Sequence, residues 1–420
     1  NLIVRTSSET QTGIVELATT AETATGTDAT RAVTPNGLHN MTTLAGAAWM
    51  LDEDDMSSDS ATKVASQQSI KAYVDSKTIA SARNCIINGN FEIWQRADSG
   101  TITEGTLLRT QDRWYDYATA DGGTLPTLSR SKGTLTSGEL TNSFYYTRLT
   151  TNGAGTSLGN DALHVFAQSI EHALRLFGGQ KVTLSFYARS SIANKKIGAY
   201  IFSSWGTGGS PSSVVVTSGD AFSLTSNWTK FNFTFTLPSN DGKTFGTDNN
   251  DFVRLEIFYM WGSNLAYGFG ETNAETYRGS GTIDITQVQL SLGDALLPFL
   301  PRSYQEEFLL CARYCYVPPT PVSSSIIGQG TCALSTMAKV IIPTPVPMYA
   351  VPSVTATYSD WIVSDEVNST TVTDIDPIAE LTTNYNPILA FATEGGLTQF
   401  RPVMIRSNGA NKKLILSAEI

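Results

Sequence analysis

The chain has 420 residues, enough for two or three domains, and its 34 glycines and 41% hydrophobic residues suit β-rich domains joined by tight turns. The formal net charge is −10, only 16% of residues are charged, and no basic cluster occurs. This composition excludes nucleic acid and an anionic membrane surface as partners but is compatible with a neutral polar ligand such as a glycan. No apolar stretch is long enough to span a bilayer, so we expect no membrane insertion, and no signal-peptide pattern occurs.

A short repeat lies near the start of the chain. Residues 29–38 (ATRAVTPNGL) align with residues 61–70 (ATKVASQQSI) at an offset of 32. Neither copy has enough large apolar side chains to bury a core, so we expect stacking on neighbours or on identical chains around an axis. Ser66 caps a predicted helix from Gln67 to about Ser76. This helix has a narrow apolar stripe, which would be covered if three copies packed together. Residues 1–83 therefore predict an extended trimeric shaft with short helices.

The pattern changes to β at about Asn84. Residues 181–189, 228–237 and 253–261 alternate between apolar and polar side chains, which is typical of half-buried antiparallel strands. In residues 283–290 the alternation slips between Ile285 and Val288, which predicts a β-bulge. About six to nine strands with Gly- and Ser-rich turns predict a sandwich over residues 84–302, most simply a jelly roll.

The last third of the chain begins with a helix signal. Ser303 and Glu306 have the spacing of a capping box, and the helix they open has an expected buried stripe of Tyr304, Phe308, Cys311, Ala312 and Cys315. Residues 317–321 are Pro-rich and end this helix, so residues 303–321 predict a linking helix and a linker. Short β runs at 340–342, 351–358, 397–405 and 414–420 predict a small C-terminal β-sandwich over residues 322–420. The predicted fold class is therefore mainly β.

No catalytic or metal-binding constellation is apparent. The four cysteines lack zinc-site spacing and the chain has three histidines, so we expect reduced thiols, no metal and no cofactor. His164 and His172 have no G-x-S-x-G motif to complete a triad. A glycan hydrolase would need a pair of carboxylates, and no local spacing pairs the candidate carboxylates of this chain. We therefore expect that the protein is not an enzyme. The candidates considered are Glu92, Asp112, Glu256, Glu271 and Asp284.

Two other sets of residues are candidates for ligands. Asn88, Asn90 and Glu92 carry oxygen atoms of the kind that calcium prefers, but without a fixed loop spacing, and capping and turn hydrogen bonds are the simpler explanation for them. Protein sites for sugars stack an aromatic ring on an apolar sugar face and surround it with planar polar groups. Gly-rich loops present such residues, so the predicted glycan-binding set is Trp205, Trp261, Tyr267, Tyr277 and Arg278.

Several segments resemble the tail fibres of tailed bacteriophages. Residues 13–19 and 26–35 (GIVELAT and GTDATRAVTP) are similar to the shaft repeat of that family, and residues 69–75 to a segment that often follows it. Residues 88–96 (NGNFEIWQR) with Asp112-Arg113-Trp114 resemble the opening of a carbohydrate-binding-module-like jelly roll, and residues 287–304 resemble its end. Residues 346–355 and 416–420 resemble the start and end of the C-terminal tip domain.

The resemblance implies a homotrimer on the virion, made in the host cytoplasm, that recognises a host surface glycan. The first residue is Asn1, so we expect a missing N-terminal part, through which other tail proteins would join. Loops 206–213 and 262–281 depart from the family, so the resemblance transfers no binding site. Two alternatives stay open: a purely structural fibre segment and a glycan-degrading tail spike.

Overall fold

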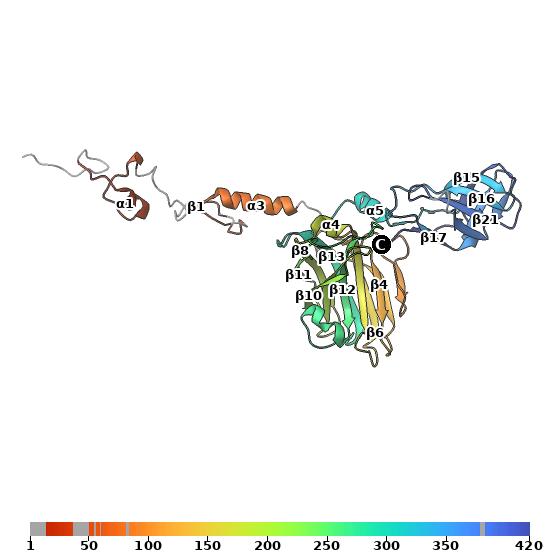
Figure 1. Ribbon diagram of the computed structural model, residues 1–420, viewed down its shortest axis with the longest axis horizontal. Coiled ribbons are helices and arrows are strands. Elements are labelled where there is room, and N and C mark those ends of the chain that lie inside the picture. The colour runs from red at the N-terminus through yellow and green to blue at the C-terminus, as the bar shows by residue number, and fades with distance from the viewer. Residues whose placement is uncertain (1–13, 37–49, 54–55, 59, 81–83, 379–382) are drawn as a thin grey trace, which may run out of the picture. The chain divides into compact units, whose positions relative to one another are not determined.

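The computed structural model describes residues 14–36, 50–53, 56–58, 60–80, 84–378 and 383–420. The chain divides into two compact units, residues 1–81 and residues 82–420. Strands dominate the second unit, and the predicted mainly β fold class is confirmed (Figure 1). Of the helices that the structure describes, none combines the length and hydropathy needed to cross a bilayer.

The first unit contains a structural repeat. Leu17 forms a parallel bridge with Ala32, and β1 (Met50–Leu51) pairs in parallel with β2 (Val64–Ala65). The chain turns helical at Pro35 and again at Gln67, where α3 (Gln67–Ala80) begins, so the sequence offset is also a structural one. The helix predicted to begin at Gln67 is thus confirmed and extends beyond Ser76. Another short helix, α1 (Thr20–Thr25), starts at a capping box formed by Thr19 and Glu22.

Apolar side chains of the first unit are not covered within the single chain. No described residue of this unit belongs to any of the three hydrophobic clusters of the protein, which all lie beyond residue 84. Six of its large apolar side chains are instead exposed, namely Ile14, Val15, Leu17, Val33, Val64 and Ile70.

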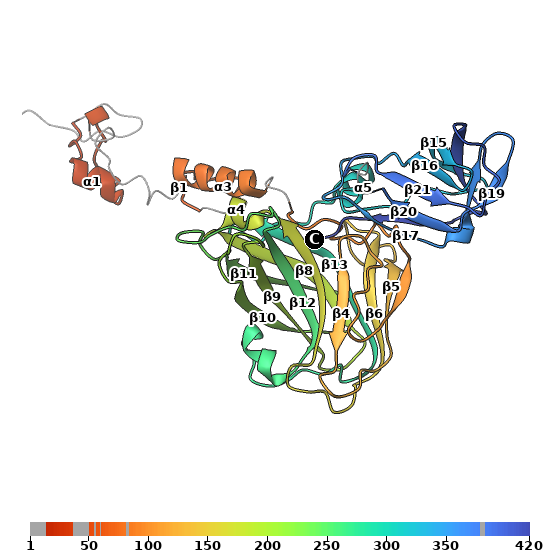
Figure 2. The same ribbon diagram turned by 45° about the vertical axis from the view of Figure 1, so that its right-hand side comes forward.

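The second unit begins with a jelly-roll sandwich of two antiparallel sheets (Figures 1 and 2). The five-stranded sheet has the order β10 (Val215–Ser223), β9 (Lys196–Ser204), β12 (Phe252–Trp261), β7 (Leu163–Glu171) and β4 (Tyr115–Thr119). The six-stranded sheet has the order β11 (Thr229–Thr236), β8 (Lys181–Ser190), β13 (Gly279–Leu292), β6 (Tyr145–Gly153), β5 (Leu128–Thr134) and β3 (Ser99–Ile102). The main core lies between these sheets, because each strand turns alternate side chains inward.

The three strands predicted from alternation are present as β8, β11 and β12. The predicted bulge is confirmed, because the register of β13 shifts between Thr286 and Gln289, with Gln287 at a φ of 53°. A helical turn, α4 (Ala173–Phe177), follows β7, and a 3-10 segment, η2 (Ser263–Phe269), packs against β9 and β10.

A helix and a second sandwich follow the jelly roll. The helix α5 (Tyr304–Ala312) begins at Ser303, whose side chain accepts a hydrogen bond from the Glu306 amide, as predicted. Its expected stripe was wrong at two positions: Tyr304 is exposed, and Cys315 lies beyond the helix in β14 (Cys315–Tyr316). Tyr304 is in the first turn of the helix, and its ring stacks on the partly covered Phe308 instead of entering the core.

The C-terminal sandwich, residues 315–420, has its own hydrophobic core. Its three-stranded sheet has the order β14, β23 (Leu414–Ser417) and β17 (Ser353–Ala356). Its larger sheet has the order β19 (Ser369–Thr371), β18 (Trp361–Ser364), β22 (Pro402–Ser407), β15 (Ile326–Leu334), β16 (Met337–Ile341), β21 (Ile388–Ala392) and β20 (Asp374–Pro377). A short 3-10 segment, η3 (Tyr358–Asp360), precedes β18. Each of the four predicted β runs contains or overlaps one of these strands.

Candidate functional site

The outer face of the five-stranded sheet carries aromatic rings paired with charged groups, whereas the solvent-facing side of a sheet usually carries small polar side chains. The strand registers place Tyr115 of β4, Ala167 of β7, Glu256 of β12 and Tyr200 of β9 in one row across the sheet. Side chains two positions away along each strand share the same surface. We call this surface the aromatic face, and its residues are Tyr115, Tyr117, Ala167, Tyr200, Phe202, Arg254 and Glu256.

Charged groups of the aromatic face are held against its rings. Arg254 and Glu256 form an ion pair with 2.5 Å between Nε and Oε1. The guanidinium of Arg254 also lies 4.5 Å from the centroid of the Phe202 ring, and that of Arg109 lies 4.9 Å from the Tyr115 ring. Such cation–π contacts fix the planes of both partners. The surface therefore offers oriented hydrogen-bond donors and acceptors beside aromatic carbon.

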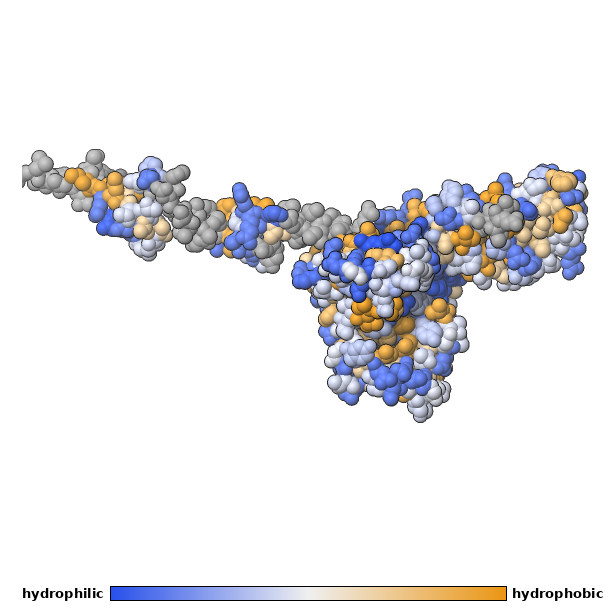
Figure 3. Space-filling model, in the orientation of Figure 1, coloured by the Kyte–Doolittle hydropathy of each residue, from blue (hydrophilic) through white to orange (hydrophobic). Residues whose placement is uncertain are grey.

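Burial, the charge of Glu256 and a hydrogen bond to that carboxylate all raise the pKa of Tyr200. Its hydroxyl therefore stays protonated at neutral pH and can act as a hydrogen-bond donor. Tyr115, Ala167 and Glu256 are buried, whereas Tyr117, Tyr200 and Phe202 are half-buried. Half-buried rings on a rigid sheet present edges and part of their faces without needing to reorganise. Figure 3, in the view of Figure 1, shows hydrophobic residues gathered in the region of β12 and β4.

The segment η2 borders the aromatic face. The ring of Phe269 stacks on Tyr200 with 5.6 Å between centroids, and it also packs against Phe258 and Trp261. Tyr267, one of the predicted glycan-binding residues, is 68% exposed on the same segment, and its proximity adds to the raised pKa of Tyr200. Of the predicted set, Tyr267 is the residue that joins the aromatic face.

Three members of the predicted glycan-binding set are corrected by their burial. Trp205 is 0% exposed and belongs to the main core, although its loop sequence indicated a solvent-facing ring. Trp261 is buried because a bulge between Phe258 and Met260 turns it to the outer side, where Phe269 covers it. Tyr277 is buried with its hydroxyl 2.9 Å from His164 Nδ1. None of these rings has a free face for a sugar.

Arg278, the fifth member, is exposed but bound to a neighbour. Its Nε and Nη2 atoms donate to the Glu275 carboxylate at 2.7 and 2.6 Å. The structure therefore brings Arg278 together with Glu275 and Lys195, another partner of that carboxylate, and not with Tyr267.

Most of the carboxylates considered for hydrolysis are engaged in local pairs. Asp284 binds both Arg148 and Arg189, and Glu271 binds Lys196. Asp112 is buried, accepts hydrogen bonds from Gln95, and burial raises its pKa to about 7. Glu92 lies beside Asn90 in a cavity.

The histidine candidates are in structural networks. His164 Nε2 lies 3.0 Å from Asp116, whose carboxylate also binds the fully buried Arg130. Burial lowers the pKa of His164, so its ring stays neutral at neutral pH. His172, at the start of α4, shares Asp251 with Arg175. Because the Asp116 network lies between the two sheets, it ties them together and does not face a ligand.

The oxygen-rich segment that includes Asn88 is committed to the fold. The Asn88 amide bonds to the backbone of Ile93 and Asp112, which leaves it no ligand oxygen to offer. Within the described ranges, no group of three or more His, Cys, Asp or Glu side chains could hold a metal ion.

Tyr115, Tyr117, Tyr200, Phe202 and Arg254 were not predicted as site residues. A signal for them was present in the sequence. On strands whose one face is apolar, these positions fall on the opposite face, and an aromatic residue there is unusual for a solvated surface.

Neither a protein-family model nor a curated protein sequence matches this chain. Among solved structures, it is similar to a family 4 carbohydrate-binding module, at 17% identity over 49% of this chain and 98% of that one, with a TM-score of 0.27. A putative sugar-binding protein from Bacteroides thetaiotaomicron shares 12% identity over 50% of this chain and all of that chain (100%), with a TM-score of 0.27. The enzymatically active domain of tailspike protein 4 from bacteriophage CBA120 shares 12% identity over 50% of this chain and 21% of that chain, with the same TM-score of 0.27. Likenesses this low establish neither a family nor a function.

Proposed function

We propose that this chain is a tail fibre of a tailed bacteriophage that attaches the virion to its host by non-covalent binding of a surface glycan. The observation that carries the binding proposal is the group of half-buried rings on the outer sheet face, Tyr117, Tyr200 and Phe202, which lie on and beside the row that contains the buried Tyr115 and Glu256. The half-buried rings Tyr117, Tyr200 and Phe202 can stack on the apolar face of a sugar, and the partly exposed Arg254 guanidinium, held by the buried Glu256 carboxylate, can donate to its hydroxyl groups. Because these side chains are on strands, no loop has to become ordered when the ligand binds.

The fibre part of the proposal is supported by the first unit. Its repeat exposes Ile14, Leu17, Val33, Val64 and Ile70, which three identical chains around an axis would cover. A homotrimer would also present three aromatic faces at once, so that weak sites combine into strong attachment.

We propose binding without catalysis. Glycoside hydrolysis needs two carboxyl groups on opposite sides of the scissile bond. Glu256 on the aromatic face is already paired with Arg254. Among the described residues of that face, no second carboxylate stands opposite it.

The test is adsorption of the full-length chain to host cells and to a printed array of bacterial surface glycans. Tyr117→Ala and Tyr200→Ala should lower glycan binding by about tenfold or more, and Tyr358→Ala, a partly exposed tyrosine of the C-terminal sandwich, should not. Full adsorption by both face variants would contradict the proposed site. Absence of glycan binding by the wild type would favour the structural fibre segment, and release of reducing ends would favour the tail spike.

A further inference from the structure

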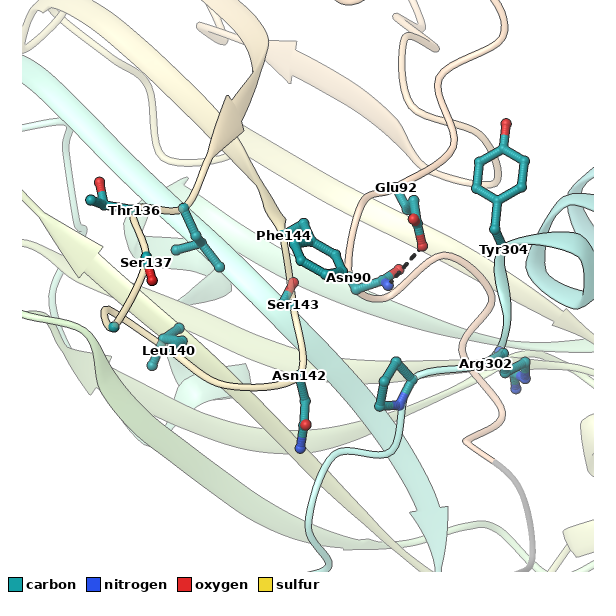
Figure 4. Close-up of a pocket in the computed structure, with 13 residues that line it drawn as sticks. Asn90, Glu92, Thr136, Ser137, Leu140, Asn142, Ser143, Phe144, Arg302 and Tyr304 are labelled. Atoms are coloured by element: carbon teal, nitrogen blue, oxygen red, sulfur yellow. Dashed lines mark hydrogen bonds between the residues drawn. The ribbon is translucent and has the colours of Figure 1, made fainter.

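A cavity of about 630 Å³ lies on the jelly roll, and none of the residues that line it belongs to the aromatic face. Three separate segments enclose it: the first loop with Asn90 and Glu92, the connection 135–144 between β5 and β6, and residues 301–304 at the start of α5. Figure 4 shows Asn90 and Glu92 between Phe144 and Tyr304. We call it the loop pocket.

The loop pocket has hydrogen-bond acceptors without matching donors. Asn90 is 5% exposed, and its Oδ1 has no hydrogen-bond partner among the described residues. Its Nδ2 donates to Glu92 Oε2 at 3.4 Å, which fixes the orientation of the amide. A buried acceptor left without a donor costs about 1–3 kcal/mol, so a ligand that supplies a donor would recover this energy.

Arg302, the cationic residue that lines the loop pocket, is already engaged by other groups of the protein. Arg302 donates to the backbone carbonyls of Ile86 and Asn84 and pairs with Glu307 at 3.1 Å. It therefore does not neutralise Glu92, which forms no ion pair in the part of the chain that the structure describes. The pocket thus favours a ligand rich in donor groups over an anion.

Two aromatic rings of the pocket are exposed. Phe144 is 73% exposed and Tyr304 is 60% exposed. Large exposed rings beside a cavity mark a binding surface more often than isolated apolar residues do. Asn90 and Glu92 together carry three side-chain oxygens, fewer than the six to eight oxygen ligands that calcium takes.

We propose that the loop pocket is a second saccharide-binding site that acts independently of the aromatic face. A sugar unit places an apolar ring face against Phe144 or Tyr304 and donates hydroxyl hydrogens to Asn90 Oδ1 and the Glu92 carboxylate. The ligand class rests on the proposed function, whereas the site itself rests on the pocket's own residues. Two sites on each chain would let one fibre bind two units of a polysaccharide or two different glycans.

The experiment probes one array of bacterial surface glycans with four fluorescently labelled full-length chains. These are the wild type, the pocket variant Phe144→Ala/Glu92→Gln, the face variant Tyr117→Ala, and the control Phe400→Ala, which removes an equally exposed ring of the C-terminal sandwich. Both pocket side chains are at least partly exposed, so we expect the pocket variant to fold, and its unfolding midpoint is measured alongside.

We expect the pocket variant to lose about tenfold or more in binding to at least one glycan that the face variant still binds. Binding of every glycan at wild-type strength by the pocket variant would overturn the second site while leaving the proposed function intact. A wild type that binds no glycan would overturn both. If the pocket variant lost all glycan binding and the face variant kept wild-type binding, the result would support the loop pocket and overturn the aromatic face.

Discussion

The guanidinium of Arg113 and the carboxylate of Glu419 lie 2.6 Å apart although 306 positions separate them in the sequence. Arg96 also binds Glu419, at 3.0 Å, and Arg109 lies 3.9 Å from it. The three arginines belong to the jelly roll, and Glu419 follows β23 of the C-terminal sandwich. One buried carboxylate therefore links the two sandwiches.

Glu419→Gln should destabilise the second unit by about 3–5 kcal/mol, because it leaves buried arginines without their counter-charge. Burial alone would raise the pKa of Glu419, but Arg113, Arg96 and Arg109 hold it below its usual value of 4.5. A lowered pKa gives stability that is present above pH 4.5 and is lost as the pH falls through the folded-state pKa. Urea unfolding at several pH values would show the difference between variant and wild type shrinking in acid. Glu394→Gln, on an exposed residue, is the control, and an equal effect of both variants would contradict the link.

Asp112 lies close to Arg96, and its contribution to stability should change with pH in the opposite direction to that of Glu419. Burial raises its pKa from 3.8 to about 7, so the folded protein holds this proton more tightly than the unfolded chain does. Stability from this group is present below pH 3.8 and is lost as the pH rises to about 7, by about 4 kcal/mol at most. A carboxyl NMR titration should show a midpoint near 7 that is missing from Asp112→Asn. A midpoint near 4 would refute the prediction.

Trp205→Ala should reduce stability by about 3–5 kcal/mol, because the ring is fully buried in the main core and its removal leaves a cavity. Tyr267→Ala, on an exposed ring, should change stability by no more than about 0.5 kcal/mol. Thermal or urea unfolding of both variants checks this contrast. Equal stability in the two variants would mean that Trp205 is not a core residue.

The strands could be predicted because one of their faces is buried. Val182, Leu184 and Phe186 of β8 enter the core, so the alternation in the sequence reports directly on the fold. The bulge at Gln287 was visible for the same reason, since an extra residue shifts every later side chain to the other face. A comparable bulge in β12 escaped notice, because both faces of that strand are apolar around Phe258.

The candidate site was less predictable, because it depends on neighbours across strands. Tyr115 and Tyr200 lie in one row only because β7 and β12 pair between them, and no local spacing encodes this order. The loop pocket joins Asn90, Phe144 and Tyr304 from distant segments. Trp205 shows the converse, since a Gly-rich loop sequence did not reveal that the core extends beneath it.

The full chain should sediment as a trimer of 45.2 kDa subunits, whereas residues 82–420 alone should be a folded monomer. The reason is that both sandwiches have their own cores, while the first unit leaves its apolar side chains exposed. Ile70→Asp should weaken the trimer, because it would place like charges where copies meet, and the exposed Gln68→Asp is the matched control. Sedimentation velocity distinguishes the species. A fully folded single chain of 45.2 kDa would remove the physical basis of the fibre proposal.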